Sequence, residues 1–166
     1  MAKSRSHKLA LVVAALVLPA ALAGCGGSNS TSPAAKVAKG IYTTASDCAD
    51  SGKLTYEQCS DLIYAAVEKH EADAPTYTEL RFCEAKEGEG KCEFTANDKI
   101  RPKLLAFLVT ASQPPHAIPL YATPKGEPGF RDLGGATYLH TNEELVFSEH
   151  AVTVFERNNP KRMRRF

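Results

Sequence analysis

The stretch TYEQCSDLIYAAVEKHEADAP, Thr55 to Pro75, carries the clearest helix signal in the sequence. Thr55 followed three residues later by Gln58 fits a capping box, and Pro75 marks the end of the helix. Apolar side chains and one histidine recur at helical spacing on one face, which we expect to be buried: Cys59, Leu62, Ile63, Ala66, Val67 and His70. A histidine near a helix C-terminus interacts favourably with the helix dipole. We therefore interpret His70 as structural rather than as a metal ligand.

Four cysteines surround this helix as two pairs, Cys48 with Cys59 and Cys83 with Cys92. A short repeat relates the pairs, because YTTASDCADSG begins at Tyr42 and YTELRFCEAKEG begins at Tyr77. In each copy, Tyr-Thr, four residues, Cys and a glycine precede the second cysteine. The repeat therefore favours the disulfides Cys48–Cys59 and Cys83–Cys92, while the crossed pairing of a helical hairpin remains the alternative. Closing a loop of about a dozen residues contributes roughly 3 kcal/mol to stability.

The pattern changes after Cys92. KLLAFLVTA, residues 103–111, is a continuous apolar run that periodicity alone assigns neither to a helix nor to a strand. Three β-prone segments follow a proline-rich stretch, at residues 136–141, 144–148 and 151–156, with turns expected at 134–135 and 142–144. We expect an α+β fold, in which a small, disulfide-stapled helical N-terminal half is followed by a short antiparallel β-sheet.

The fifth cysteine, Cys25, follows an apolar run at residues 9–23. A basic start followed by a short apolar run is typical of a secretory signal. The run is shorter than the roughly 20 residues of a membrane-spanning helix, and Pro19 interrupts it, so a retained transmembrane anchor is the weaker alternative. Leu22-Ala23-Gly24-Cys25 resembles the lipobox of bacterial lipoproteins. That resemblance implies cleavage before Cys25 and lipidation of its thiol, whereas in the other alternative Cys25 ends the signal of a soluble protein.

These features predict four parts of the chain: a lipoprotein signal peptide at 1–24, a lipidated flexible tether at 25–39, a single periplasmic domain at 40–157 and a basic tail at 158–166. The tether is expected because GGSNSTSPAAKVAK is small, polar and rich in Gly and Ser. Gly26, by resemblance to enteric lipoproteins, favours the outer membrane, with the domain facing the periplasm.

Charge is distributed unevenly along the chain. The formal charge is +1, but residues 40–94 carry 12 acids against 5 bases, and the end of the chain is basic, with Lys161, Arg162, Arg164 and Arg165. Such a tail suits contact with an anionic lipid or envelope polymer; the alternative is that it contacts the acidic domain or nothing. An acidic body argues against nucleic-acid binding.

Catalytic and metal motifs are weak. His116, His140 and His150, with Glu143, Glu144 or Glu149, are the raw material of a hydrolytic or zinc site, but H-E-x-x-H, G-x-S-x-G and a glycine-rich phosphate loop are missing from the sequence. The segment 47–58 aligns with a calcium loop, yet Ala49 and Gln58 replace two ligands. The cysteine spacings differ from C-x-x-C, which disfavours redox chemistry. We therefore expect a binding or structural role without a cofactor or metal; the alternative is a metal-dependent or hydrolytic periplasmic enzyme using the three histidines.

Several short motifs follow one another in a fixed order along the chain: DC (47–48), EQC (57–59), A-P-x-Y (74–77), G-E-G-K-C (88–92), a proline before an apolar run (102–109) and PLY (119–121). As an ordered set they resemble the uncharacterised YgiB-type lipoproteins of proteobacteria. The resemblance covers about residues 40–121 and the lipobox, and the chain departs from it after Tyr121. It implies an envelope address and the cysteine framework, and it implies no reaction. We expect the domain to have the membrane as a partner, through its lipid anchor, and an anionic envelope polymer or another envelope protein.

Overall fold

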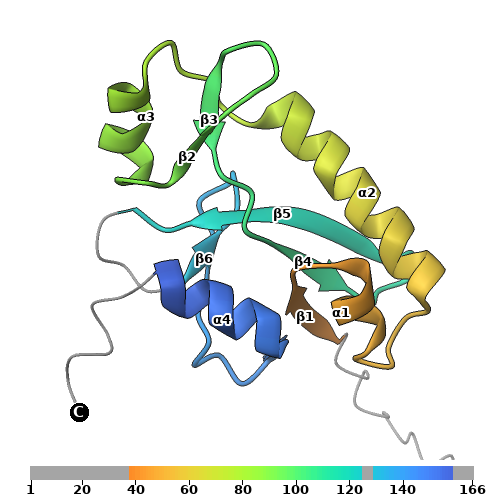
Figure 1. Ribbon diagram of the computed structural model, residues 1–166. Coiled ribbons are helices and arrows are strands. Elements are labelled where there is room, and N and C mark those ends of the chain that lie inside the picture. Colours follow the sequence, from red (N-terminus) through yellow and green to blue (C-terminus); the bar gives the residue numbers. More distant parts are fainter. Residues whose placement is uncertain (1–37, 125–128, 159–166) are drawn as a thin grey trace, which may run out of the picture. The chain divides into compact units, whose positions relative to one another are not determined.

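The computed structural model describes residues 38–124 and 129–158, and Figure 1 shows how their elements are arranged. Cys25 and the four bases of the tail lie outside the described residues. The elements in chain order are β1 (Lys39–Tyr42), α1 (Ala45–Ala49), α2 (Tyr56–Asp73), α3 (Leu80–Glu87), β2 (Cys92–Phe94), β3 (Ile100–Pro102), β4 (Ala106–Thr110), β5 (His116–Ala122), β6 (Phe130–Arg131), β7 (Thr137–Tyr138), β8 (Leu145–Phe147) and α4 (Glu149–Asn158).

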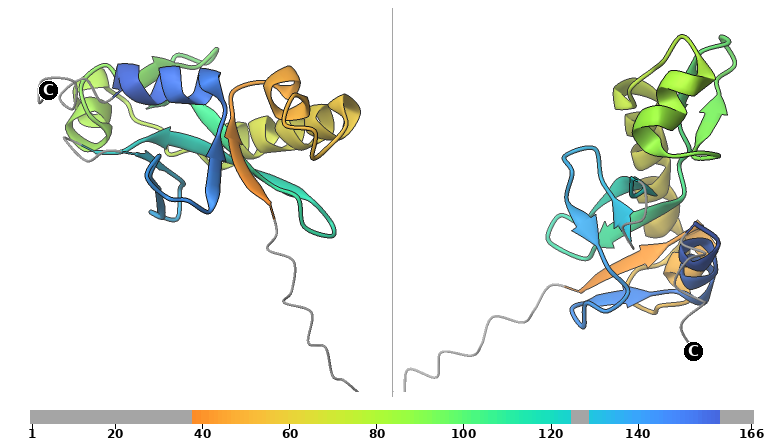
Figure 2. Two further views of the ribbon diagram at one scale, coloured as in Figure 1. Left: turned by 90° about the horizontal axis from the view of Figure 1, so that it is seen from below. Right: turned by 90° about the vertical axis from the view of Figure 1, so that its left-hand side faces the viewer.

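Six strands form one sheet in the order β7-β6-β5-β4-β1-β8. Neighbouring strands are antiparallel, except that β1 and β8 are parallel. Figure 2 shows these two strands side by side, β1 in orange and β8 in blue. Ile41 of β1 pairs with Leu108 of β4 on one side and with Phe147 of β8 on the other. The remaining strands, β2 and β3, form a separate antiparallel pair.

Strand β4 is buried along its whole length because both faces of the sheet are covered. Phe107 and Val109 pack with α1 and α2, whereas Leu108 belongs to a second cluster with Phe130 and with Phe155 of α4. Alternate residues of a strand point to opposite faces. A strand that is buried on both faces is apolar throughout, which explains why the run at 103–111 shows no alternation.

Helix α2 confirms the helix predicted between Thr55 and Pro75. The Thr55 hydroxyl accepts a hydrogen bond from the Gln58 N–H, and the Gln58 side chain accepts one from the Thr55 N–H, which together form the capping box. Cys59, Ala66 and His70 are buried on the expected face. Local capping and helical periodicity therefore specify this element without help from distant residues.

The predicted arrangement of the fold, a helical N-terminal half followed by a short antiparallel sheet, is wrong. Strand β1 belongs to the N-terminal half and lies inside the sheet, and its pairing with β8 is parallel. The β-prone segment at 151–156 is part of helix α4. Ala151 and Phe155, four residues apart, share its buried face, and the Ser148 hydroxyl accepts a hydrogen bond from the Ala151 N–H at its start. Burial and capping outweigh the β propensity of Val and Thr.

We expect Phe130→Ala to destabilise the domain by about 3–5 kcal/mol, because it empties a buried site where Phe147 and Phe155 pack on the ring. The measurement is urea unfolding followed by circular dichroism. The matched control is Phe94→Ala, whose ring is 67% exposed and whose loss should stay within about 0.5 kcal/mol. Equal losses for the two variants would contradict the described core.

Candidate functional site

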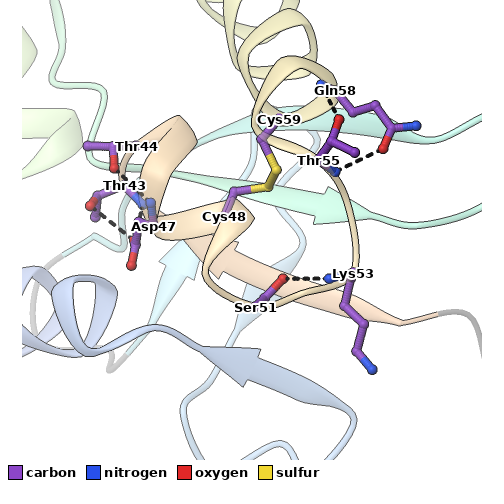
Figure 3. The surroundings of a disulfide bond; sticks show 9 residues. All are labelled: Thr43, Thr44, Asp47, Cys48, Ser51, Lys53, Thr55, Gln58 and Cys59. Atoms are coloured by element: carbon purple, nitrogen blue, oxygen red, sulfur yellow. Dashed lines mark hydrogen bonds between the residues drawn. A yellow bond between two sulfur atoms is a disulfide. The ribbon is translucent and has the colours of Figure 1, made fainter.

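The two disulfide bonds that the sequence predicts are present. Cys48 of α1 is bonded to Cys59 of α2, and Cys83 of α3 is bonded to Cys92 of β2. Each bond closes a short loop, with sequence separations of 11 and 9 residues, so the pairing is the local one that the repeat favours and not the crossed one. All four cysteines are buried. The first bond holds α1 against the start of α2 (Figure 3).

Asp47, next to this disulfide, connects the two ends of the domain. Its Oδ2 accepts hydrogen bonds from the Thr43 N–H at 2.8 Å and from the Ser148 hydroxyl at 2.6 Å, across 101 residues of sequence. His150 Nδ1 lies 3.5 Å from the other carboxylate oxygen. Asp47 therefore joins α1 to the start of α4. Gln58, at the far end of the segment that aligns with a calcium loop, uses its side chain in the cap of α2.

His70 lies at the centre of a polar cluster contributed by α2, β2, β3 and β5. Its Nδ1 is 3.0 Å from the Tyr121 hydroxyl, and its buried Nε2 is 3.5 Å from Glu93 Oε1, too far for a hydrogen bond. Arg101 completes the cluster by donating to Glu93 and, through two nitrogens, to Glu71. Two carboxylates, of Glu71 and Glu93, therefore share the single positive charge of Arg101 beside a buried imidazole.

Burial determines the protonation of this cluster. Loss of hydration lowers the pKa of the His70 imidazole below its ordinary value of 6.5, and the Arg101 charge lowers it further, against an opposing contribution from Glu93. Burial also raises the pKa of Tyr121 to about 12. At neutral pH a protonated Tyr121 hydroxyl can therefore donate to Nδ1 of a neutral His70, which leaves the proton of the imidazole on Nε2, directed towards Glu93.

A second polar cluster joins α3 to the main sheet. Arg131 of β6 forms an ion pair with the buried Glu87 of α3, and the Tyr77 hydroxyl donates to the same carboxylate at 2.7 Å. Loss of hydration and this carboxylate raise the pKa of Tyr77 to about 12. The Arg131 guanidinium also lies 5.7 Å from the centre of the Tyr121 ring, so the two clusters adjoin. Sequence reasoning missed both, because their members are far apart in the chain and share no motif.

The three histidines proposed as catalytic candidates have different neighbours. His116 Nδ1 lies 3.1 Å from the Ser112 hydroxyl, His140 packs on Phe147 and Phe155, and His150 lies beside Asp47. The glutamates considered with them, Glu143, Glu144 and Glu149, are exposed. In the part of the chain that the structure describes, no three His, Cys, Asp or Glu side chains are placed to hold a metal ion. The contacts described for the three histidines are therefore with Ser112, with the rings of Phe147 and Phe155, and with Asp47.

A family model described as a protein of unknown function, DUF1190, matches residues 36–146 of the chain. The chain belongs to the DUF1190 family. The match extends past Tyr121, where the resemblance seen in the sequence ended, and includes β6, β7 and most of β8. No curated protein and no solved structure matches the chain significantly.

The DUF1190 domain contains no helix, within residues 38–124 and 129–158, that is long and apolar enough to cross a membrane. His70 is buried in this domain, and the sequence correctly placed it on the inner face of α2. The sequence indicated this cluster only through a histidine on a buried helical face. The tyrosine, the arginine and the carboxylate that surround His70 come from other elements, and no sequence pattern pointed to them.

We expect the stability of this DUF1190 domain to fall as the pH drops below 6.5. The pKa of His70 is lower in the folded protein than in the unfolded chain, so as the pH falls the unfolded chain takes up the proton first. The stability that the neutral His70 contributes is therefore fully present above the pKa of the unfolded chain and is lost as the pH falls through the folded pKa. Urea unfolding at about pH 7.5 and about pH 5.5 measures the loss. His70→Gln should reduce this loss, whereas His150→Gln, at a side chain 77% exposed, should leave it unchanged. An unchanged pH dependence in His70→Gln would contradict a neutral buried imidazole.

Proposed function

We propose that this DUF1190 protein is an envelope lipoprotein, anchored in a membrane through lipid on Cys25, whose folded domain binds a partner or supports the envelope. The observation that carries the proposal is the number of cysteines and their pairing. The sequence has five cysteines, and the four in the described residues form two disulfide bonds. Cys25, which follows Leu-Ala-Gly, is the fifth.

The disulfides support export. Such bonds form and persist in oxidising compartments such as the bacterial periplasm, and they are rare in the cytosol. Lipid then explains the remaining thiol, because each buried CH₂ contributes about 0.8 kcal/mol and several acyl chains together anchor a protein stably. Gly26, by resemblance to enteric lipoproteins, supports the outer membrane as the site of anchoring.

A binding or structural role accords with how the polar residues are used. Asp47, His70, Glu87 and Arg131 all connect elements of the fold to one another. His116, His140 and His150 have separate neighbours. These residues therefore support a rigid, stapled module held near a membrane, and we assign them no catalytic step.

We propose the basic tail as a second contact with the anionic envelope. Lys161, Arg162, Arg164 and Arg165 follow directly after α4. Basic residues near an anionic membrane contribute about 1 kcal/mol each at ordinary ionic strength. A tail of this kind would turn the domain towards the surface that its lipid already occupies.

We expect mass spectrometry of the mature protein to find an N-terminal peptide that starts at Cys25 and carries acyl chains. Cys25→Ser should remove the lipid and release the protein from the membrane fraction, because the anchor is lost. Ser28→Ala, in the same segment, is the matched control and should remain membrane-bound. An unmodified Cys25 in the exported protein would refute the lipoprotein proposal.

We expect the tail to make vesicle binding depend on lipid charge. The full chain should bind anionic phospholipid vesicles more tightly than neutral ones, by about tenfold or more. Replacing the four tail bases by glutamine should abolish this preference in a sedimentation assay, while the paired control Lys86→Gln and Lys99→Gln keeps it. If the four-base variant retains the preference, the tail is not the contact.

A further inference from the structure

An apolar pocket of about 120 Å³ opens beside strands β1 and β8. Gly40 and Tyr42 of β1, Val109 of β4 and Val146 of β8 contribute to its wall, and Leu54 lines it from the segment between α1 and α2. These strand residues share the face that α1 and α2 cover, as the cluster containing Tyr42, Val109 and Leu54 shows. The pocket lies where that cover ends, because Val146 on the outermost strand is 58% exposed.

The pocket depends on a glycine. A Cβ on Gly40 would lie within 2.5 Å of the Tyr42 ring, so the aromatic ring lies directly over the glycine backbone. A larger residue at position 40 would displace Tyr42 and change the wall. The wall is therefore formed by packed side chains and main chain.

Two positive charges border this pocket. Lys39 and Lys53 are among its lining residues and are exposed. No hydrogen bond or ion pair among the described residues uses either ammonium group; only the Lys53 main-chain N–H is engaged, with Ser51. Figure 3 shows the Lys53 side chain extending away from the disulfide. A ligand with an apolar group for the pocket and a carboxylate for the lysines therefore matches its chemistry.

The volume of the pocket limits the size of the apolar group that it can hold. An engineered protein cavity of about 150 Å³ accepts one benzene molecule, so this pocket holds one branched aliphatic side chain. It is too small for the chain of a membrane lipid, because each CH₂ needs on the order of 25 Å³ at the packing density of protein interiors.

The outer edge of β8 favours a peptide over a free acid. Among the described residues, β8 pairs with β1 alone and is the last strand of the sheet. The Ser148 N–H donates to the Ile41 carbonyl, and main-chain groups alternate sides along a strand, so those of Phe147 face the open edge. An extended segment can therefore add to this edge by main-chain hydrogen bonds while its side chain enters the pocket.

We propose that the pocket binds the C-terminal residue of a partner polypeptide. Its aliphatic side chain, of valine or leucine size, enters the pocket on the face of β1 and β8; its terminal carboxylate pairs with Lys39 and Lys53; and the preceding residues extend along the outer edge of β8. The proposal names a partner for the binding role proposed above and in that sense rests on it.

The test uses the full chain, purified in a nonionic detergent, and a fluorescein-labelled peptide ending in Gly-Ser-Val-Leu with a free carboxylate, measured by fluorescence anisotropy. We expect saturable binding, weakened about tenfold or more when the C-terminus is amidated. The double variant Lys39→Gln/Lys53→Gln should bind the acid and the amide equally, while Lys86→Gln/Lys99→Gln should retain the difference. Val146→Asp, at an exposed position, should weaken binding about tenfold, and Leu139→Asp, at the residue that follows β7, is its matched control.

Four results would overturn the proposal: no saturation at millimolar protein, equal binding of acid and amide by the unchanged chain, equal effects of Val146→Asp and Leu139→Asp, or competition by 4-methylpentanoate as effective as that of the unlabelled peptide. The last would reassign the pocket to a free carboxylic acid. None of these results bears on Cys25, whose lipid is read separately by mass spectrometry, so the failure of either proposal is recognised independently of the other.

Discussion

The fold depends on the burial of β4 between two layers of helices. Leu108 packs towards Phe155 of α4 on one face, while Phe107 and Val109 pack towards α1 and α2 on the other. Helices α1 and α4 depend on the sheet for their stability, because α1 has only five residues and α4 only ten, and isolated helices of that length are marginal in water. This double burial fixes which helices cover each face of the sheet.

Buried polar contacts fix how the layers meet. Asp47 joins α1 to the start of α4, His70 and Tyr121 join α2 to β5, and Glu87 with Arg131 joins α3 to β6. Apolar packing tolerates small shifts, whereas a buried charge without its partner costs several kcal/mol. These contacts therefore select one arrangement among those that would bury similar area. The disulfides act in the same direction by keeping α1 on α2 and α3 on β2.

Local signals in the sequence predicted the parts of the structure that local physics determines. The capping box of Thr55 and Gln58 specified α2, and the repeat around the cysteines specified both disulfides. Strand β1 was missed because four residues carry too little pattern, and its strand character comes from partners near residues 108 and 146. Helix α4 was missed because Val and Thr favour strands, while its burial depends on Phe130, which is distant in the chain.

In the candidate site, too, the sequence predicted what local patterns determine and missed contacts between distant residues. His70 was placed correctly on an inner face and interpreted as structural, and the hydrogen bond with Tyr121 supplies the reason. His116, His140 and His150 contact Ser112, Phe147 and Asp47, respectively, and their spacing in the sequence did not predict these neighbours, because spacing says little about distance between strands and loops.

The parallel pairing of β1 with β8 affects the order in which the fold can form during synthesis. During synthesis β1 leaves the ribosome about a hundred residues ahead of the strand that completes its edge, and α4, which covers Ile41 and Leu108, comes later still. Because folding is slow when contacts are this distant in the chain, the sheet and its covering layers are complete only after α4 has been synthesised.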